Sequence, residues 1–123
     1  MGGLCYVYLK KEDTLILRNL EPGETEIRIP GKTLKATLRK TRNGFKLLLS
    51  TPRGVAKIKT LIIENTGPGV LSITRVLPER IESFRLSWDG RSLKIIGLRL
   101  SEKPVELNLI LVPMDLSSFN PSQ

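Results

Sequence analysis

Residues 33–64 read TLKATLRK-TRNG-FKLLLS-TPRG-VAKIKTLIIE, and this stretch decides the expected fold. In residues 33–39, leucine or alanine alternates with lysine, threonine or arginine, so one side is apolar and the other polar. Side chains of a β-strand point alternately to its two faces, and a period of two residues therefore predicts a half-buried strand. The three segments separated by TRNG and TPRG are expected to form an antiparallel meander.

The first turn sequence, Asn43-Gly44, is the strongest short hairpin signal in the chain. A type I′ loop needs positive φ at both of its central residues, and asparagine followed by glycine is the preferred pair. A two-residue loop at this point would place Arg39 opposite Leu48 on the neighbouring strand.

The second turn sequence is TPRG at 51–54, with proline and glycine where a type I or II turn favours them. As a second hairpin loop it would place Leu48 opposite Lys57, and Lys46 opposite Lys59. Both turns predict the same two faces. The outward face is expected to carry Lys35, Thr37, Arg39, Thr41, Lys46, Leu48, Ser50, Lys57 and Lys59. The inward, apolar face is expected to carry Leu34, Ala36, Leu38, Leu47, Leu49, Ala56, Ile58 and Ile62.

The rest of the chain consists of similar short apolar runs between turn residues, and no apolar pattern of helical spacing extends over ten or more residues. About ten short strands joined by tight hairpins predict an all-β fold, an antiparallel β-sandwich or a partly closed barrel. Residues 1–112 are expected to form this single β-sandwich domain, and residues 113–123 an irregular C-terminal tail. The expected strands are 4–10, 14–20, 25–30, 33–40, 45–50, 55–64, 70–76, 80–88, 92–100 and 105–112.

One of these strands, residues 92–100, changes its apolar phase near Gly97. Glycine inside a strand often marks a bulge or a bend. We therefore expect the strand to be distorted there.

The composition argues against catalysis. The chain has no histidine and a single cysteine, Cys5. It therefore lacks the commonest general base and metal ligand, and it has no cysteine cluster for zinc. Its carboxylates are scattered over turns and outward positions. We expect a protein that is not an enzyme, with no catalytic residue, metal or cofactor. The sparse thermolabile residues are typical of thermophile proteins.

The termini and apolar runs predict no membrane span. No apolar run approaches the ~20 residues that a spanning helix needs. Residues 1–6, MGGLCY, have no charged leader before an apolar core, unlike a signal peptide. The default expectation is an intracellular, cytoplasmic protein.

Charge is concentrated in the first half of the chain. The formal net charge is +8, and residues 27–63 hold ten basic side chains and no acidic one. A field of one sign favours anionic partners. The meander is therefore predicted to bind a polyanion, either nucleic acid independently of sequence or an acidic protein surface. The predicted binding residues are Lys35, Arg39, Lys46, Lys57 and Lys59, with Lys40 and Arg42 near the hairpin tip.

Two other interpretations remain open at this point. The basic face can simply be solvated and bind nothing. Alternatively, the chain is a structural or assembly protein that forms homo-oligomers or a scaffold through sheet edges and its C-terminal tail. The expected oligomer contacts are Leu48, Met114, Leu116 and Phe119.

Overall fold

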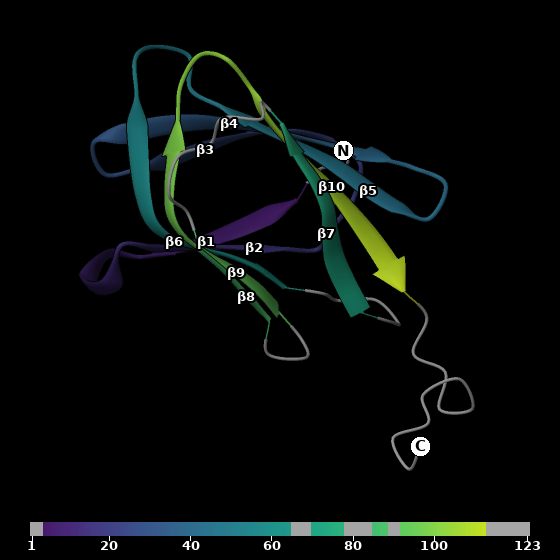
Figure 1. The fold of residues 1–123 in the computed structure, drawn as a ribbon. Helices are drawn as coiled ribbons and strands as arrows, with labels where there is room; N and C mark the ends of the chain where they lie inside the picture. The colour runs from purple at the N-terminus through teal and green to yellow at the C-terminus, as the bar shows by residue number, and fades with distance from the viewer. Residues whose placement is uncertain (1–3, 65–69, 78–84, 89–91, 113–123) are drawn as a thin grey trace.

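The computed structural model describes residues 4–64, 70–77, 85–88 and 92–112. These residues form ten β-strands and one short 3-10 turn, η1 (Figure 1). The elements are β1 (Cys5–Leu9), η1 (Lys10–Glu12), β2 (Thr14–Arg18), β3 (Gly23–Ile29), β4 (Lys32–Lys40), β5 (Gly44–Ser50), β6 (Ala56–Glu64), β7 (Val70–Leu77), β8 (Arg85–Trp88), β9 (Ser92–Leu100) and β10 (Val105–Val112).

The strands make two five-stranded sheets. The first sheet has the order β1-β2-β6-β9-β8, and the second has the order β3-β4-β5-β10-β7. In Figure 1, β5, β7 and β10 of the second sheet lie to the right of β6, β8 and β9. Neighbouring strands are antiparallel except β2 and β6, which run parallel with Ile16 beside Ile62. The expected all-β, mostly antiparallel fold is confirmed, and the described strands do not close into a barrel.

A single hydrophobic core joins the two sheets. Alternate side chains from both sheets, such as Leu61 of β6 and Leu34 of β4, belong to one buried cluster and are fully buried. Burying one leucine side chain contributes about 1.5–3 kcal/mol. The apolar faces predicted from the period of two residues therefore hold the sheets together.

The β4–β5 hairpin forms where the sequence predicts it, but its register differs by two residues. Arg39 lies opposite Lys46 and not opposite Leu48. The backbone N–H of Thr41 donates to the carbonyl oxygen of Gly44 at 3.0 Å, so the turn is one residue earlier than expected. A change of two residues in the pairing leaves every side chain on its predicted face.

The difference in register arises at Gly44, which the sequence placed in the turn. In the structure Gly44 is a strand residue that packs closely against β10. It begins β5, and a Cβ atom placed on it would lie 2.0 Å from the carbonyl oxygen of Leu109 on β10. The two-residue hairpin loop with a positive φ occurs elsewhere. Gly31, with φ of 78°, joins β3 to β4, and Ile29 pairs with Lys32 across that loop.

The second predicted hairpin, at residues 51–54, is wrong. β5 and β6 belong to different sheets, and the second edge of β5 pairs with β10, where Leu47 lies opposite Leu107. The segment between β5 and β6 carries the chain from one sheet to the other. It is held by Thr51, whose backbone N–H donates to the carbonyl oxygen of Ser101 at 2.9 Å and whose hydroxyl donates to that of Gly54 at 2.9 Å.

The prediction that Ile62 lies on the inward face is wrong. The other seven residues assigned to that face belong to the core, but Ile62 points to the opposite side of the first sheet. In a regular strand, residues three apart point to opposite faces, but Ile58 and Leu61 of β6 are both buried. The alternation of inward and outward side chains is therefore interrupted between them. On the neighbouring strand β9, Gly97 has φ of 80°, which fits the bend expected there.

Candidate polyanion-binding surface

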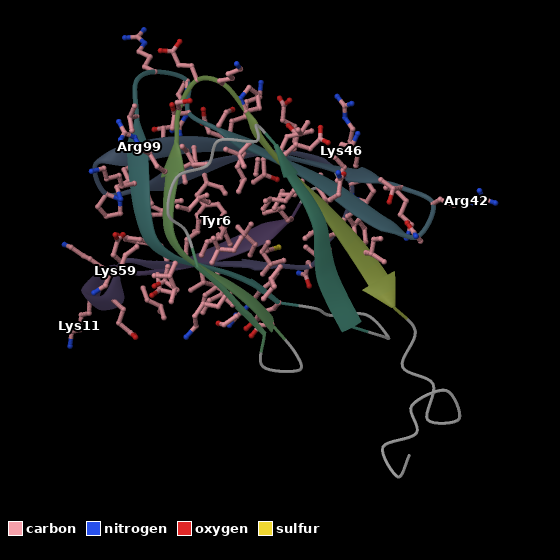
Figure 2. The ribbon with its side chains drawn as sticks, in the orientation of Figure 1. Tyr6, Lys11, Arg42, Lys46, Lys59 and Arg99 are labelled. Carbon is pink, nitrogen blue, oxygen red and sulfur yellow. The ribbon has the colours of Figure 1, made fainter. Side chains whose placement is uncertain are left out.

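The cations predicted to share one face lie on two different faces. Lys35, Arg39 and Lys46 belong to the second sheet, whereas Lys57 and Lys59 lie on β6 of the first sheet. Figure 2 shows Lys46 and Lys59 on different sides of the molecule. The prediction that Lys46 faces Lys59 is wrong, because the crossing between β5 and β6 separates them.

Carboxylates accompany the cations on the outward face of the second sheet. They come from β3 and β10, the strands on either side of the β4–β5 hairpin. The ion pairs are Lys35–Glu24 (3.5 Å), Lys46–Glu106 (3.9 Å) and Arg28–Glu26 (2.7 Å). This face therefore has mixed charge, and most of its predicted binding cations already have an acidic partner.

Lys40 and Arg42 lie near the tip of the β4–β5 hairpin. The Nζ atom of Lys40 is 4.8 Å from the centre of the Phe45 ring, which lies directly opposite on β5. Arg42 is exposed, and Figure 2 shows it at the far end of the hairpin from β6. Neither residue joins Lys57 and Lys59 in one surface.

The predicted oligomer contacts are placed only in part. Leu48 is half-buried on the outward face of the second sheet, where it lies opposite Thr37 on β4 and Glu106 on β10. Met114, Leu116 and Phe119 lie outside the described residues.

The outward face of the first sheet carries the more strongly basic surface. Lys57 lies directly opposite Arg99 of β9, and both are exposed. Four exposed cations on this face form what we name the first-sheet cation group: Lys57, Lys59, Lys94 and Arg99. Within the described residues, no carboxylate forms an ion pair with any of the four.

The pairing of Lys57 with Arg99 has an energetic cost. Like charges directly opposite one another on two strands destabilise a sheet by roughly 0.2–1 kcal/mol. The sequence predicted this kind of repulsion for Lys46 and Lys59. The fold instead places like charges opposite one another between β6 and β9 and, on the second sheet, between Arg39 of β4 and Lys46 of β5.

The carboxylate of Asp13 lies close to this surface, but its oxygens already have other partners within the chain. The Tyr8 hydroxyl donates to Asp13 Oδ1 at 2.7 Å, and the Lys59 backbone N–H donates to Oδ2 at 3.2 Å. Lys32 Nζ is 3.7 Å from Oδ1. The hydrogen bond from Tyr8 holds the pKa of Asp13 below its usual value, and the same bond raises the pKa of Tyr8. Asp13 binds the backbone of Lys59 and forms no ion pair with its ammonium group, and Lys59 is exposed.

The Asp13 contact also brings η1 close to β6. Lys11 of η1 is exposed, and Asp13 follows this turn directly in the chain. Figure 2 shows Lys11, Lys59 and Arg99 on the same side of the molecule. Lys11 therefore adds a further cation beside the first-sheet cation group.

Beside the cations, the same outward face carries aliphatic side chains, which we name the apolar strip. Val7, Ile16 and Ile62 lie in register on β1, β2 and β6. In the adjacent row, Leu9 of β1 and Ile96 of β9 flank two threonines. None of these five residues belongs to the core cluster.

Two of the hollows on the surface are lined by described residues. The larger, about 520 Å³, is lined by Glu24, Glu26 and Lys35 among others, and the smaller, about 280 Å³, by Lys32 and Arg53 among others.

Three further observations describe the possible chemistry of the described residues. They include no group of three or more histidine, cysteine, aspartate or glutamate side chains able to hold a metal ion. They leave no buried side-chain nitrogen or oxygen without a hydrogen-bond partner. They also contain no helix with the length and apolar character required to cross a membrane.

Sequence reasoning missed Lys94 and Arg99 as members of the surface. Both lie in the half of the chain whose charges cancel, so the charge count did not select them. Their outward direction was visible, since each lies between buried apolar residues of β9. The missing information was that β9 pairs with β6.

Comparison with known proteins adds no family to this description. No protein-family model, curated protein or solved structure matches the chain.

Proposed function

We propose that this chain is a non-enzymatic protein that binds a polyanion, with nucleic acid bound independently of sequence as the partner. The first-sheet cation group carries the proposal, because its side chains are exposed and have no acidic partner among the described residues. Lysine and arginine neutralise phosphates and release the counterions condensed on nucleic acid. The proposed surface therefore keeps Lys57 and Lys59 of the predicted set, adds Lys94 and Arg99, and lies on the first sheet alone.

The side chains of this face favour contacts with the phosphate backbone. On the described part of the outward face, none of the side chains is aromatic, and the tyrosines of β1 pack against the core. Proteins that bind single strands stack bases on aromatic rings. A face of cations and threonines can instead hold the phosphates of a duplex without reading bases.

A salt titration of binding to a fluorescent duplex tests the proposal. We expect the affinity of the wild-type chain to fall steeply between about 50 and 200 mM salt. In the double variant Lys57→Gln with Arg99→Gln, the slope of log affinity against log salt should be smaller by about two, because each lost phosphate contact contributes about one.

The matched control is Lys35→Gln with Lys46→Gln on the second sheet, where each lysine has a glutamate partner. Both double variants lower the formal net charge from +8 by two, so any difference between them reports position and not total charge. We expect the control to keep the wild-type slope. Absence of duplex binding at about 50 mM salt, where phosphate contacts are strongest, would contradict the proposal.

A second candidate function is a structural or assembly role through sheet edges and the C-terminal tail. Two observations favour it: the edge strand β1 has no charged residue, and the apolar strip lies on the outward face beside it. Uncharged edge strands are ready to pair with another chain. Sedimentation velocity of the full chain and of a chain ending at Pro113 tests this role. A monomer in both would rule it out.

A further inference from the structure

The apolar strip is the feature that phosphate binding does not use. Leu9 and Ile96 are each 38% exposed, whereas Val7 and Ile62 are half-buried. The five side chains of the strip lie on four successive strands of the first sheet and point away from the core. Val7, Ile16 and Ile62 form one aliphatic row, and two threonines separate Leu9 from Ile96 in the next row. Apolar side chains gathered on one sheet face often mark an interaction site.

Cations lie on both sides of Ile96 along β9. On one side, Lys94 is directly opposite Ile62 of β6. On the other side, Arg99 lies opposite Lys57 of β6. An occupant that covers the strip and these cations must therefore bring both apolar groups and negative charge.

We propose that the apolar strip and the first-sheet cation group form one docking surface for a polypeptide segment that carries both aliphatic and acidic side chains. This inference goes beyond the proposed function: the same cations take part, but the partner is an acidic, amphipathic segment of another protein. An extended strand with alternating side chains, or a helix with one apolar face, meets this requirement.

Nucleic acid matches only part of the surface. Its phosphates pair with the cations, but its bases stack on aromatic rings, and the strip is entirely aliphatic. A bound duplex would leave Leu9 and Ile96 without a partner. The aliphatic strip therefore favours protein.

A lipid surface also matches poorly. Proteins that lie on membranes bury their apolar side chains about 5–10 Å into the boundary region. Here Ile16 is only 8% exposed, and the strip lies in the plane of a sheet beside lysine and arginine side chains that reach further out. The cations would touch the headgroups before the strip could insert.

A second copy of the chain is disfavoured by charge. Two such faces packed together would bring the unpaired cations of both copies into one interface. Glu64, on the same face, is already paired with Arg18 at 2.7 Å. An acidic partner supplies the charge that a second copy lacks.

Three synthetic peptides of equal length separate the two parts of this surface: an alternating leucine–glutamate repeat, a serine–glutamate repeat and a leucine–lysine repeat. Binding of each fluorescent peptide to the full chain is measured by anisotropy. We expect the leucine–glutamate peptide to bind at least tenfold more tightly than the serine–glutamate peptide. The leucine–lysine peptide should not bind, because its charge repels the cations.

The variant that tests the strip is Leu9→Ser with Ile96→Ser. Both side chains are partly exposed and outside the core cluster, so the fold should persist, and thermal unfolding checks this. We expect a loss of about tenfold in affinity for the leucine–glutamate peptide and no change for duplex DNA. Val55→Ser is the matched control, because Val55 is 52% exposed and lies outside the strip.

The outcomes separate this inference from the proposed function. Equal binding of the two acidic peptides, or wild-type affinity in the Leu9/Ile96 double variant, overturns the inference while duplex binding can still hold. Stronger, Leu9- and Ile96-dependent binding to phosphatidylserine vesicles also overturns it. If the leucine–glutamate peptide binds as expected but the duplex does not, the inference stands and the nucleic-acid partner fails.

Discussion

The two outward faces of this molecule carry cations in similar number but differ in electrostatic character. On the second sheet, Lys35 and Lys46 each have a glutamate within ion-pair distance. On the first sheet, Lys57 and Arg99 lie opposite one another, and neither has an acidic partner among the described residues. The contrast teaches that the position of the carboxylates, and not the number of lysines, decides which basic surface is available to a ligand.

The difference comes from the neighbours that each strand acquires. The β4–β5 hairpin lies between β3 and β10, which bring Glu24 and Glu106 to its outward side. β6 lies between β2 and β9, which bring aliphatic and cationic side chains. The charge pattern on a sheet face therefore depends on the residues of the neighbouring strands as well as on those of the strand itself.

The largest expected effect is a loss of stability when β5 and β10 of the second sheet are forced apart at Gly44. In Gly44→Ala the new Cβ atom would lie 2.0 Å from the carbonyl oxygen of Leu109, so β5 and β10 must move apart. We expect a loss of about 3 kcal/mol or more in the free energy of unfolding, measured in urea. Separation of the two strands would also remove Glu106 from Lys46.

The control for this change is Gly54→Ala. Gly54 has a positive φ of 69°, but open space surrounds the added Cβ atom. The cost should be limited to the left-handed conformation, about 1–2 kcal/mol. Equal losses in the two variants would show that the approach to β10 does not constrain Gly44.

The next largest expected effect is a gain in duplex affinity when two carboxylates on the second sheet are removed. Glu24→Gln with Glu106→Gln leaves Lys35 and Lys46 without acidic partners. We expect duplex affinity at about 50 mM salt to rise roughly tenfold, because two more cations can contact phosphates. If the affinity does not rise, ion pairing is not what distinguishes the two faces.

The control for the carboxylates is Glu21→Gln with Glu102→Gln. Both residues are exposed in the segments between strands, and neither forms an ion pair among the described residues. The net charge rises by the same two units. We expect a smaller gain in affinity than for the Glu24/Glu106 double variant.

A pH-dependent effect is expected at Asp13, the carboxylate beside the first-sheet cations. The hydrogen bond from Tyr8 lowers the pKa of Asp13 in the folded state. Ionised Asp13 therefore stabilises the fold above its unfolded pKa, near 3.9, and this contribution is lost as pH falls through the folded pKa. In Asp13→Asn the contribution should be absent.

Thermal unfolding at pH 7 and at about pH 3 measures this effect. Wild type should be more stable than Asp13→Asn at pH 7, and the difference should shrink at the lower pH. Asparagine tolerates the left-handed conformation of this position, where φ is 47°. Glu12→Gln is the control, because Glu12 is exposed and its side chain forms no recorded bond among the described residues. A difference that stays constant with pH would contradict the role of the carboxylate.

The smallest effect is expected from Lys57→Glu. This change places a carboxylate opposite Arg99 and relieves a repulsion between like charges. We expect the free energy of unfolding to rise by up to about 1 kcal/mol, while duplex affinity falls. Lys94→Glu is the control: Lys94 lies opposite Ile62 and Ser87, so stability should not change. A stability loss in Lys57→Glu would show that the two cations do not repel.

Much of the local structure was predictable from the sequence. The alternation in β4 placed Leu34 and Ala36 in the core and Lys35 on the outside, and the structure confirms all three. This prediction succeeded because side-chain direction in a strand depends only on the position of each residue along the chain. The prediction for Ile62 failed because the bend between Ile58 and Leu61 has no signal in β6 itself.

The pairing of distant strands was not predictable. Turn chemistry at residues 51–54 indicated a sharp change of direction, which is consistent with a hairpin as well as with a crossing between sheets. The structure makes the crossing, because β5 pairs with β10 and β6 with β2 and β9. Gly44 shows the same limit: its sequence context indicates a turn, but its close contact is with Leu109.

The sequence by itself determined that this protein is all-β, which side of most strands is apolar, and that the chain is strongly basic. Only the tertiary structure decided where that charge is exposed, since it separates Lys46 from Lys59 and places Lys57 opposite Arg99. The physical reason is the range of the interactions. Alternation follows from neighbouring residues, whereas the electrostatic character of a sheet face depends on strands that are distant in sequence.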